Sequence, residues 1–180
     1  MAESFVNSVT RAVGVVTSSS AGSVGVQTNL ITGITTTNVT VGDLIQNSNY
    51  IAGTKVASVV STSSVTADRD STNTTAASSP TVKFLGLTTA YTSAASTKSI
   101  IIGGTFANNT DNEVELTVHL YDNSATTTPA IVSRIPVPNG SSFVLSDTGK
   151  TVLEGLDAIR VYCDTANGVD VQLGILKGVS

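Results

Sequence analysis

The stretch EVELTVHLYDNS, residues 113–124, alternates between apolar and polar or aromatic side chains almost without interruption. Val114, Leu116, Val118 and Leu120 fall on one side of an extended chain. Because successive side chains of a β-strand point to opposite faces, this period of two predicts a strand with one buried and one solvent-facing side. The stretch therefore predicts a sheet that packs its apolar side into a core.

Similar strand signals fill the rest of the second half. Short apolar or alternating segments bounded by Asn, Asp, Gly or Pro lie at 99–106, 130–135, 141–145, 157–163 and 169–176. Pro136 and Pro138 cannot donate to a ladder, so the segment before them ends a strand or lies on an edge. Asn167-Gly168 predicts a type I′ hairpin between the last two segments. Strands at this spacing predict an antiparallel β-sandwich, jelly-roll or immunoglobulin-like, over residues 86–180.

The first half is more broken, and Val, Ile and Thr dominate its apolar segments. We predict an N-terminal arm and first strand in 1–25, with the strand at 9–16 and a loop at TSSSAGS, residues 17–23. Residues 26–85 predict a small β-module that ends in a polar linker, 67–81. We expect the first strand to join the sandwich, so that the module is inserted after it.

Composition narrows the function classes. Charged residues make up 12% of the 180 residues, about half the roughly 25% of an average soluble domain. A surface rich in Ser, Thr and Asn favours a subunit with large protein contacts, although adhesins and secreted β-proteins share it. The net charge of −4 and the absence of Lys or Arg runs argue against nucleic-acid binding. No apolar run is long enough for a membrane span, and residues 1–16 do not form a secretory signal, so we expect a chain made in a cytoplasm.

The polar side of the 113–124 strand is the only candidate for catalysis. His119, the single histidine, shares this side with Glu113, Glu115 and Tyr121. A nucleophile elbow, G-x-S-x-G, is absent from the sequence. Glu113 and Glu115 would lie roughly 6.6 Å apart on a strand, but every E-x-E strand has this spacing, and no apolar surroundings favour a raised pKa. We therefore expect no catalytic residues: this side is a solvent-facing surface or a contact with another subunit.

Metal and cofactor sites are not expected either. One histidine and one cysteine cannot build a usual structural zinc site, and we expect Cys163 to be a core residue. Asp68-Arg69-Asp70 lacks the ligand pattern of a calcium loop. Gly103-Gly104 is followed by neither a lysine nor a helix that could hold phosphate. The sequence predicts a non-enzymatic protein without cofactors.

Two segments carry a resemblance to a known group of proteins. LTTAYTSAASTKSIIIGGTFANNTDNEVELTVHL, residues 87–120, resembles the start of a small β-sandwich domain in structural proteins of tailed bacteriophages, especially marine and cyanobacterial ones. Thr89, Tyr91 and Thr92 match its T-x-Y-T-x-P-A opening, while Ala94 or Ala95 takes the place of the proline. The later P-V-P-x-G-S-S at 136–142 and D-x-I-x-V at 157–161 continue the likeness. Residues 31–59 are similar to a short module of phage virion proteins.

The resemblance implies a virion component without enzymatic activity. Its partners would be further copies of itself and other virion proteins, such as the major capsid protein or neck and tail proteins, and neither nucleic acid nor membrane. A capsid decoration or cement protein is the first expectation, with a neck, tail or fibre component as the alternative. A carbohydrate- or receptor-binding adhesive module and a tail enzyme remain as competing classes.

Overall fold

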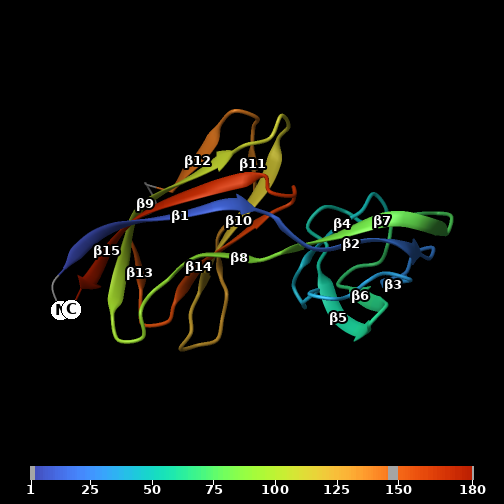
Figure 1. Cartoon of the computed structure of the whole chain (residues 1–180), viewed down its shortest axis with the longest axis horizontal. Helices are drawn as coiled ribbons and strands as arrows, with labels where there is room; N and C mark the ends of the chain where they lie inside the picture. Colours follow the sequence, from blue (N-terminus) through green and yellow to red (C-terminus); the bar gives the residue numbers. More distant parts are fainter. Residues whose placement is uncertain (1–2, 146–149, 180) are drawn as a thin grey trace. The chain divides into compact units, whose positions relative to one another are not determined.

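A computed structural model describes residues 3–145 and 150–179 of the chain. Within these ranges the chain forms β-strands and turns and no helix (Figure 1). The predicted all-β class is therefore confirmed. In chain order the strands are β1 (Ser4–Val13), β2 (Val15–Val24), β3 (Leu30–Thr32), β4 (Leu44–Gln46), β5 (Val56–Ser61), β6 (Ser64–Ala67), β7 (Ala77–Gly86), β8 (Thr88–Thr92), β9 (Lys98–Asn108), β10 (Val114–Tyr121), β11 (Ala130–Val137), β12 (Ser142–Leu145), β13 (Thr151–Leu153), β14 (Ala158–Cys163) and β15 (Val169–Val179).

The strands divide between two compact units. The sandwich unit contains β1 and β8–β15, and the insert unit contains β2–β7 together with the short segment 164–166. β1 pairs with β15 in antiparallel register, so the N-terminal strand joins the sandwich and the module follows it, as predicted. The predicted strand 9–16 is wrong in its extent. Gly14 has a φ of 94° and separates β1 from β2, and glycine adopts such a backbone angle without steric penalty.

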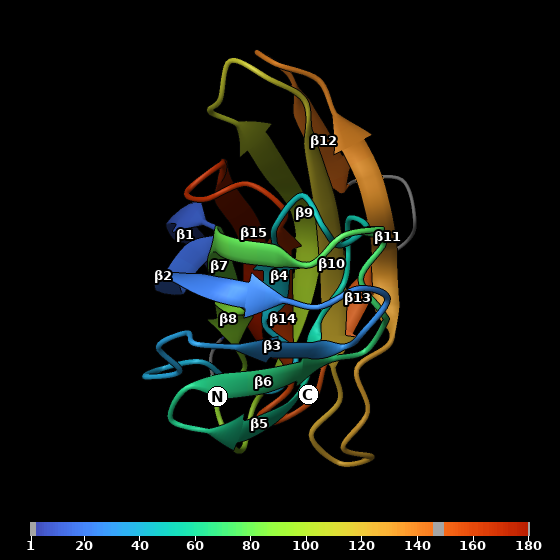
Figure 2. The ribbon, with the colours of Figure 1, turned by 90° about the vertical axis from the view of Figure 1, so that its right-hand side faces the viewer.

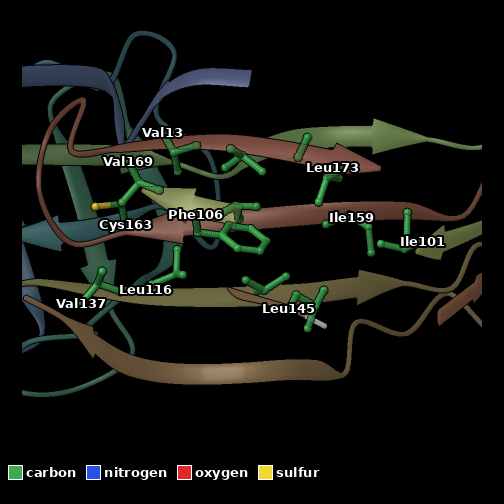
Figure 3. Packing of buried hydrophobic residues seen from close by; sticks show 14 of the residues in the cluster. Val13, Ile101, Phe106, Leu116, Val137, Leu145, Ile159, Cys163, Val169 and Leu173 are labelled. Atoms are coloured by element: carbon green, nitrogen blue, oxygen red, sulfur yellow. The ribbon is translucent and has the colours of Figure 1, made fainter. Parts of the chain in front are cut away.

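The sandwich unit consists of two antiparallel sheets. One has the order β1-β15-β9-β12, with β13 also paired to β9, and the other has the order β11-β10-β14-β8. Their facing side chains form a single core (Figure 3). The largest fully buried members are Phe106, Leu116, Leu153, Ile159, Leu173 and Ile175. Cys163 belongs to this core, as predicted.

β10 confirms the strand predicted from residues 113–124. Val114, Leu116 and Val118 are fully buried, while the residues between them are half-buried. β10 lies in the middle of its sheet, between β11 and β14. β11 contains Pro136 and lies at the edge of the same sheet, which confirms the edge position predicted from its prolines.

The predicted Asn167-Gly168 hairpin is wrong. β14 pairs with β10 and β8, whereas β15 pairs with β9 and β1, so the chain crosses from one sheet to the other between residues 163 and 169. Both strands bury one apolar side, and this pattern is the same for two strands that pair and for two strands that face each other across a core. Local alternation therefore could not distinguish the two arrangements.

The insert unit is one antiparallel sheet, built of short and long strands, and it has its own core. Its strand order is β4-β7-β2-β3-β6-β5, and Figure 2 shows β7, β2, β3, β6 and β5 side by side in this order. The core contains Val24, Ile31, Ile34, Val39, Ile45, Tyr50, Val56, Val65, Ala67, Val82 and Phe84. The unit thus has an apolar cluster that is separate from that of the sandwich unit.

Two polar stretches of the insert unit differ from prediction. Residues 17–23, expected as a loop, lie within β2 and pair with β7. Their hydroxyls bond to neighbouring chain: Ser18 donates to the Thr35 carbonyl and Ser20 accepts from the Thr35 amide. Residues 77–81 of the expected linker 67–81 form the start of β7. Serine-rich strands are missed because their stability comes from ladder and hydroxyl hydrogen bonds rather than an apolar period.

Candidate functional site

The two glutamates considered for catalysis, Glu113 and Glu115, differ in exposure and contacts. Glu115 forms a bidentate ion pair with Arg134 of β11, with Nε–Oε2 and Nη2–Oε1 distances of 2.9 Å and 3.0 Å. Glu113 precedes β10 and is exposed. A general acid needs apolar surroundings, whereas this carboxylate is held in an arginine fork. Glu115 is therefore a cross-strand stabilising residue.

His119 contacts a backbone carbonyl and an aromatic ring. Its Nδ1 lies 3.0 Å from the Thr128 carbonyl oxygen, which makes the Nδ1–H form the donor of that hydrogen bond. Its Nε2 is buried without a hydrogen-bond partner among the described residues. The ring packs edge-on against Tyr162, 5.6 Å between centroids. A catalytic triad needs a carboxylate at one ring nitrogen and a nucleophile at the other, and this ring has neither contact.

Two further side chains of this polar face contact each other. The Arg160 guanidinium lies 3.7 Å from the centre of the Tyr121 ring, in a cation–π contact. Arg160 is directly opposite His119 in the register of β14 and β10. The face that contains the sequence-predicted candidates is thus occupied by internal contacts between neighbouring strands. These contacts stabilise the sheet.

Other candidates from the sequence have structural roles. Asp68 accepts a hydrogen bond from the Lys55 amide, 2.9 Å away. Over residues 3–145 and 150–179, no group of three or more His, Cys, Asp and Glu side chains is placed to hold a metal ion. The same part of the chain contains no helix of the length and apolarity needed to cross a membrane.

The structure shows an apolar surface that the sequence reasoning missed. The sheet β1-β15-β9-β12 buries one side in the sandwich core and leaves the other side, here called the outer sheet face, uncovered by the sandwich unit's described residues. Large apolar side chains are exposed on this face: Phe5 by 77%, Val9 by 65%, Val144 by 53%, Val152 by 50% and Ile102 by 43%. Several exposed apolar side chains of this size on one sheet face mark a candidate contact for another protein.

The register places four apolar side chains in one continuous row. Phe5 of β1 lies opposite Leu176 of β15, Leu176 lies opposite Ile100 of β9, and Ile100 lies opposite Val152 of β13. This row of four apolar side chains crosses the sheet at right angles to the strands. Ile102 protrudes beside it, at a bulge where the β9–β15 register shifts.

Next to this row the outer sheet face is hollowed. Gly174 of β15 lies directly opposite Gly103 of β9, so two neighbouring positions lack side chains. The resulting open depression has a volume of about 480 Å³, and Phe5, Asn7, Ile102, Thr105, Val144 and Gln172 lie around it. Neither glycine has the positive φ that would require glycine. The hollow therefore results from the missing side chains and not from an unusual backbone conformation.

Among the residues that the structure describes, the charged ones lie toward the two ends of the outer sheet face. Arg11 and Asp170 form an ion pair of 3.7 Å at one end, and Lys98 and Glu154 form another of 3.7 Å at the other end. The rows between them contain Phe5, Asn7, Val9, Ile100, Ile102, Thr105, Val144, Val152, Gln172 and Leu176, none of which is charged. Covering this middle part would remove no charge from water, which lowers the desolvation cost of a contact.

One sequence signal could have indicated this face. Residues 99–106 contain three consecutive isoleucines, 100–102, and this apolar run is consistent with a buried strand. In the structure β9 is buried on one side only, with Ile101 and Phe106 in the core and Ile102 exposed. A doubly apolar strand in a two-layer sandwich must expose one apolar side, unless a further layer covers it.

Comparisons with known proteins add no identity. No protein-family model, curated protein or solved structure matches the chain. The chain's own residues therefore carry the functional conclusion.

Proposed function

We propose that the chain is a non-enzymatic structural protein of a tailed-bacteriophage virion, and that it decorates and stabilises the capsid as a cement protein. The observation that carries the assembly role is the outer sheet face, an apolar and uncharged surface four strands wide. A surface of this kind is stabilised when another protein covers it. The outer sheet face provides a surface for a permanent contact with another protein and does not present catalytic side chains.

The virion setting rests on the resemblance of residues 87–120 and 31–59 to modules of phage structural proteins. The first of these segments includes β8, β9 and most of β10, and therefore strands of both sandwich sheets. The second includes β4 and much of β5 in the insert unit. The likeness thus involves elements of both units rather than one loop or turn.

The paired polar face supports the non-enzymatic part of the proposal. Glu115 is engaged by Arg134, and His119 bonds to the Thr128 carbonyl. Both groups are thus held by neighbouring parts of the chain, whereas acid–base catalysis requires a group placed to transfer a proton to or from a substrate.

Purified virions of the phage that encodes the chain provide the test. Mass spectrometry should find the chain in many copies per particle, and cryo-electron microscopy should place it on the outside of the capsid. Density at the neck, tail or fibre would keep the virion role and change the location. Particles that lack the chain altogether would overturn the proposal.

Three variants sharpen this experiment. His119→Ala and Glu115→Gln should be incorporated into particles like the wild type, because their contacts lie on the polar face. Phe5→Ser should reduce incorporation, because it removes the most exposed apolar side chain of the outer sheet face. If the first two variants lose incorporation and the third does not, the contact lies on the polar face and the proposal for the outer sheet face is wrong.

A further inference from the structure

We propose that Asn139 is a site of spontaneous deamidation in the folded chain, and that the second Asn-Gly pair, Asn167-Gly168, is protected from the same reaction. The sequence contains these two Asn-Gly pairs. Asparagine is a thermally labile residue, and a following glycine, which has no side chain, leaves the next backbone nitrogen free to approach the side-chain amide. The reaction needs only water and does not depend on the proposed function.

The reaction closes a ring between the backbone and the side chain. The backbone nitrogen of Gly140 attacks Cγ of Asn139, so that a new N–Cγ bond forms and the Cγ–Nδ2 bond breaks. Nδ2 leaves as ammonia with the proton of the backbone amide. Water then opens the succinimide ring at Cγ, which gives aspartate, or at the backbone carbonyl carbon, which gives isoaspartate. Because the backbone N–H is a strong hydrogen-bond donor, the attack requires an accessible amide that no acceptor holds.

The turn at residues 138–141 meets this requirement. Asn139 and Gly140 are both exposed. The Ser141 amide donates to the Pro138 carbonyl over 3.2 Å, and φ is positive at Gly140, 65°, but not at Asn139, which is the pattern of a type II turn. Among the described residues no acceptor bonds to the Gly140 amide, and a Cβ built at Gly140 would meet no atom within 4 Å. The attacking nitrogen thus lies in open space.

The second Asn-Gly pair has the opposite surroundings. Gly168 is buried, and its amide donates to the Val13 carbonyl over 2.9 Å. Its carbonyl accepts from the Asn109 amide, also over 2.9 Å. Attack by the Gly168 nitrogen first requires a local opening that breaks these contacts. Two identical residue pairs in one chain therefore differ in the accessibility of the attacking nitrogen.

Deamidation at Asn139 also removes a contact between two turns of the sandwich unit. Asn139 Nδ2 donates to the Asp111 carbonyl over 2.9 Å. This hydrogen bond is exposed, so water competes for it and the side chain can rotate toward the Gly140 nitrogen. In the product a carboxylate, which can only accept, takes the place of the amide. The bond to Asp111 is then lost, and isoaspartate in addition adds an atom to the main chain of the turn between β11 and β12.

Peptide mapping by mass spectrometry tests the proposal on the purified full chain, incubated in mildly alkaline buffer and sampled over time. One series keeps the chain folded, and a second series unfolds it in urea. In the folded chain Asn139 should deamidate at least about tenfold faster than Asn167, the factor that a local opening free energy of about 1.4 kcal/mol imposes at Gly168. In urea the two rates should become similar, because both backbone nitrogens are then free.

Asn139→Gln is the control variant. Its longer side chain would have to close a larger ring, so this position should stay unmodified while Asn167 reacts at the wild-type rate. Circular dichroism should show the same β spectrum for both proteins.

A folded chain in which Asn167 reacts as fast as Asn139 overturns the proposal, as does a folded chain in which neither reacts while both react in urea. Aspartate without isoaspartate at position 139 also overturns it, because direct hydrolysis of the side-chain amide gives aspartate alone. Asn139 should instead yield both products.

Discussion

Asn108 is a buried polar residue at the end of β9, and its side chain makes four hydrogen bonds. Its Nδ2 donates to the carbonyls of Asn112 and Val137, and its Oδ1 accepts from the amide and the hydroxyl of Thr110. The side chain thereby fixes the turn that leads into β10. The sequence predicted turn chemistry for residues 107–112, but it could not show which of the adjacent asparagines turns inward.

Asn108→Ala should destabilise the sandwich unit by about 2–4 kcal/mol, because it leaves several buried groups without partners. Asn109→Ala is the control. The Asn109 side chain is not buried, and the substitution keeps the hydrogen bond from the backbone amide of residue 109 to the Gly168 carbonyl. Urea unfolding followed by circular dichroism measures both. Equal losses in the two variants would show that the Asn108 contacts do not fix the turn.

Tyr50 gives the insert unit a dependence on alkaline pH. Burial, and secondarily the Asp70 carboxylate, raises the pKa of its phenol to about 12, compared with about 10 in an unfolded chain. The protonated phenol is favoured by folding, so its contribution is complete below pH 10 and is lost as the pH rises from 10 toward 12. This loss amounts to about 2 kcal/mol.

Tyr50→Phe should remove this loss. The variant lacks the hydrogen bond from the Tyr50 hydroxyl to the Thr28 carbonyl and should be about 1 kcal/mol less stable than the wild type at pH 9. At pH 11.5 the difference should shrink or reverse, because phenylalanine does not ionise. Urea unfolding at both pH values tests this, and parallel losses in the two proteins would contradict it.

Among the elements, β10 shows what sequence periodicity can establish. Its apolar positions were predicted correctly, because the strand lies in the middle of a sheet with one side in the core and one side polar. β2 shows the limit: Val15 and Val16 are exposed, and serines fill its middle, so no period of two identifies its buried side. Its neighbours in the sheet, above all β7, determine that it is a strand.

Substitutions in the two cores should act on separate elements. Leu116→Ala in β10 should destabilise the sandwich unit by about 2–5 kcal/mol, since the side chain is fully buried. Phe84→Ala in β7 should do the same for the insert unit, whose apolar cluster is distinct. Hydrogen exchange should accelerate in β10 and β14 for the first variant and in β2 and β7 for the second. Acceleration of all four strands by either substitution would contradict the separation of the cores.

Over the chain as a whole, sequence reasoning predicted the class, the first strand's place in the sandwich and the inserted module. It expected the polar face of β10 to face solvent or to contact another subunit, and the structure places contacts such as Glu115–Arg134 on that side. The outer sheet face depends on register: Phe5, Leu176, Ile100 and Val152 form a row only after three strand pairings are known. No local pattern connects residues so distant in the sequence.

A cryo-electron microscopy map of the virion, at a resolution that shows side chains, tests the assembly role most directly. We expect the chain on the capsid surface, with Phe5 and Ile102 buried against another protein of the particle. A map in which this face points into solvent, or in which the chain has no density, would contradict the account.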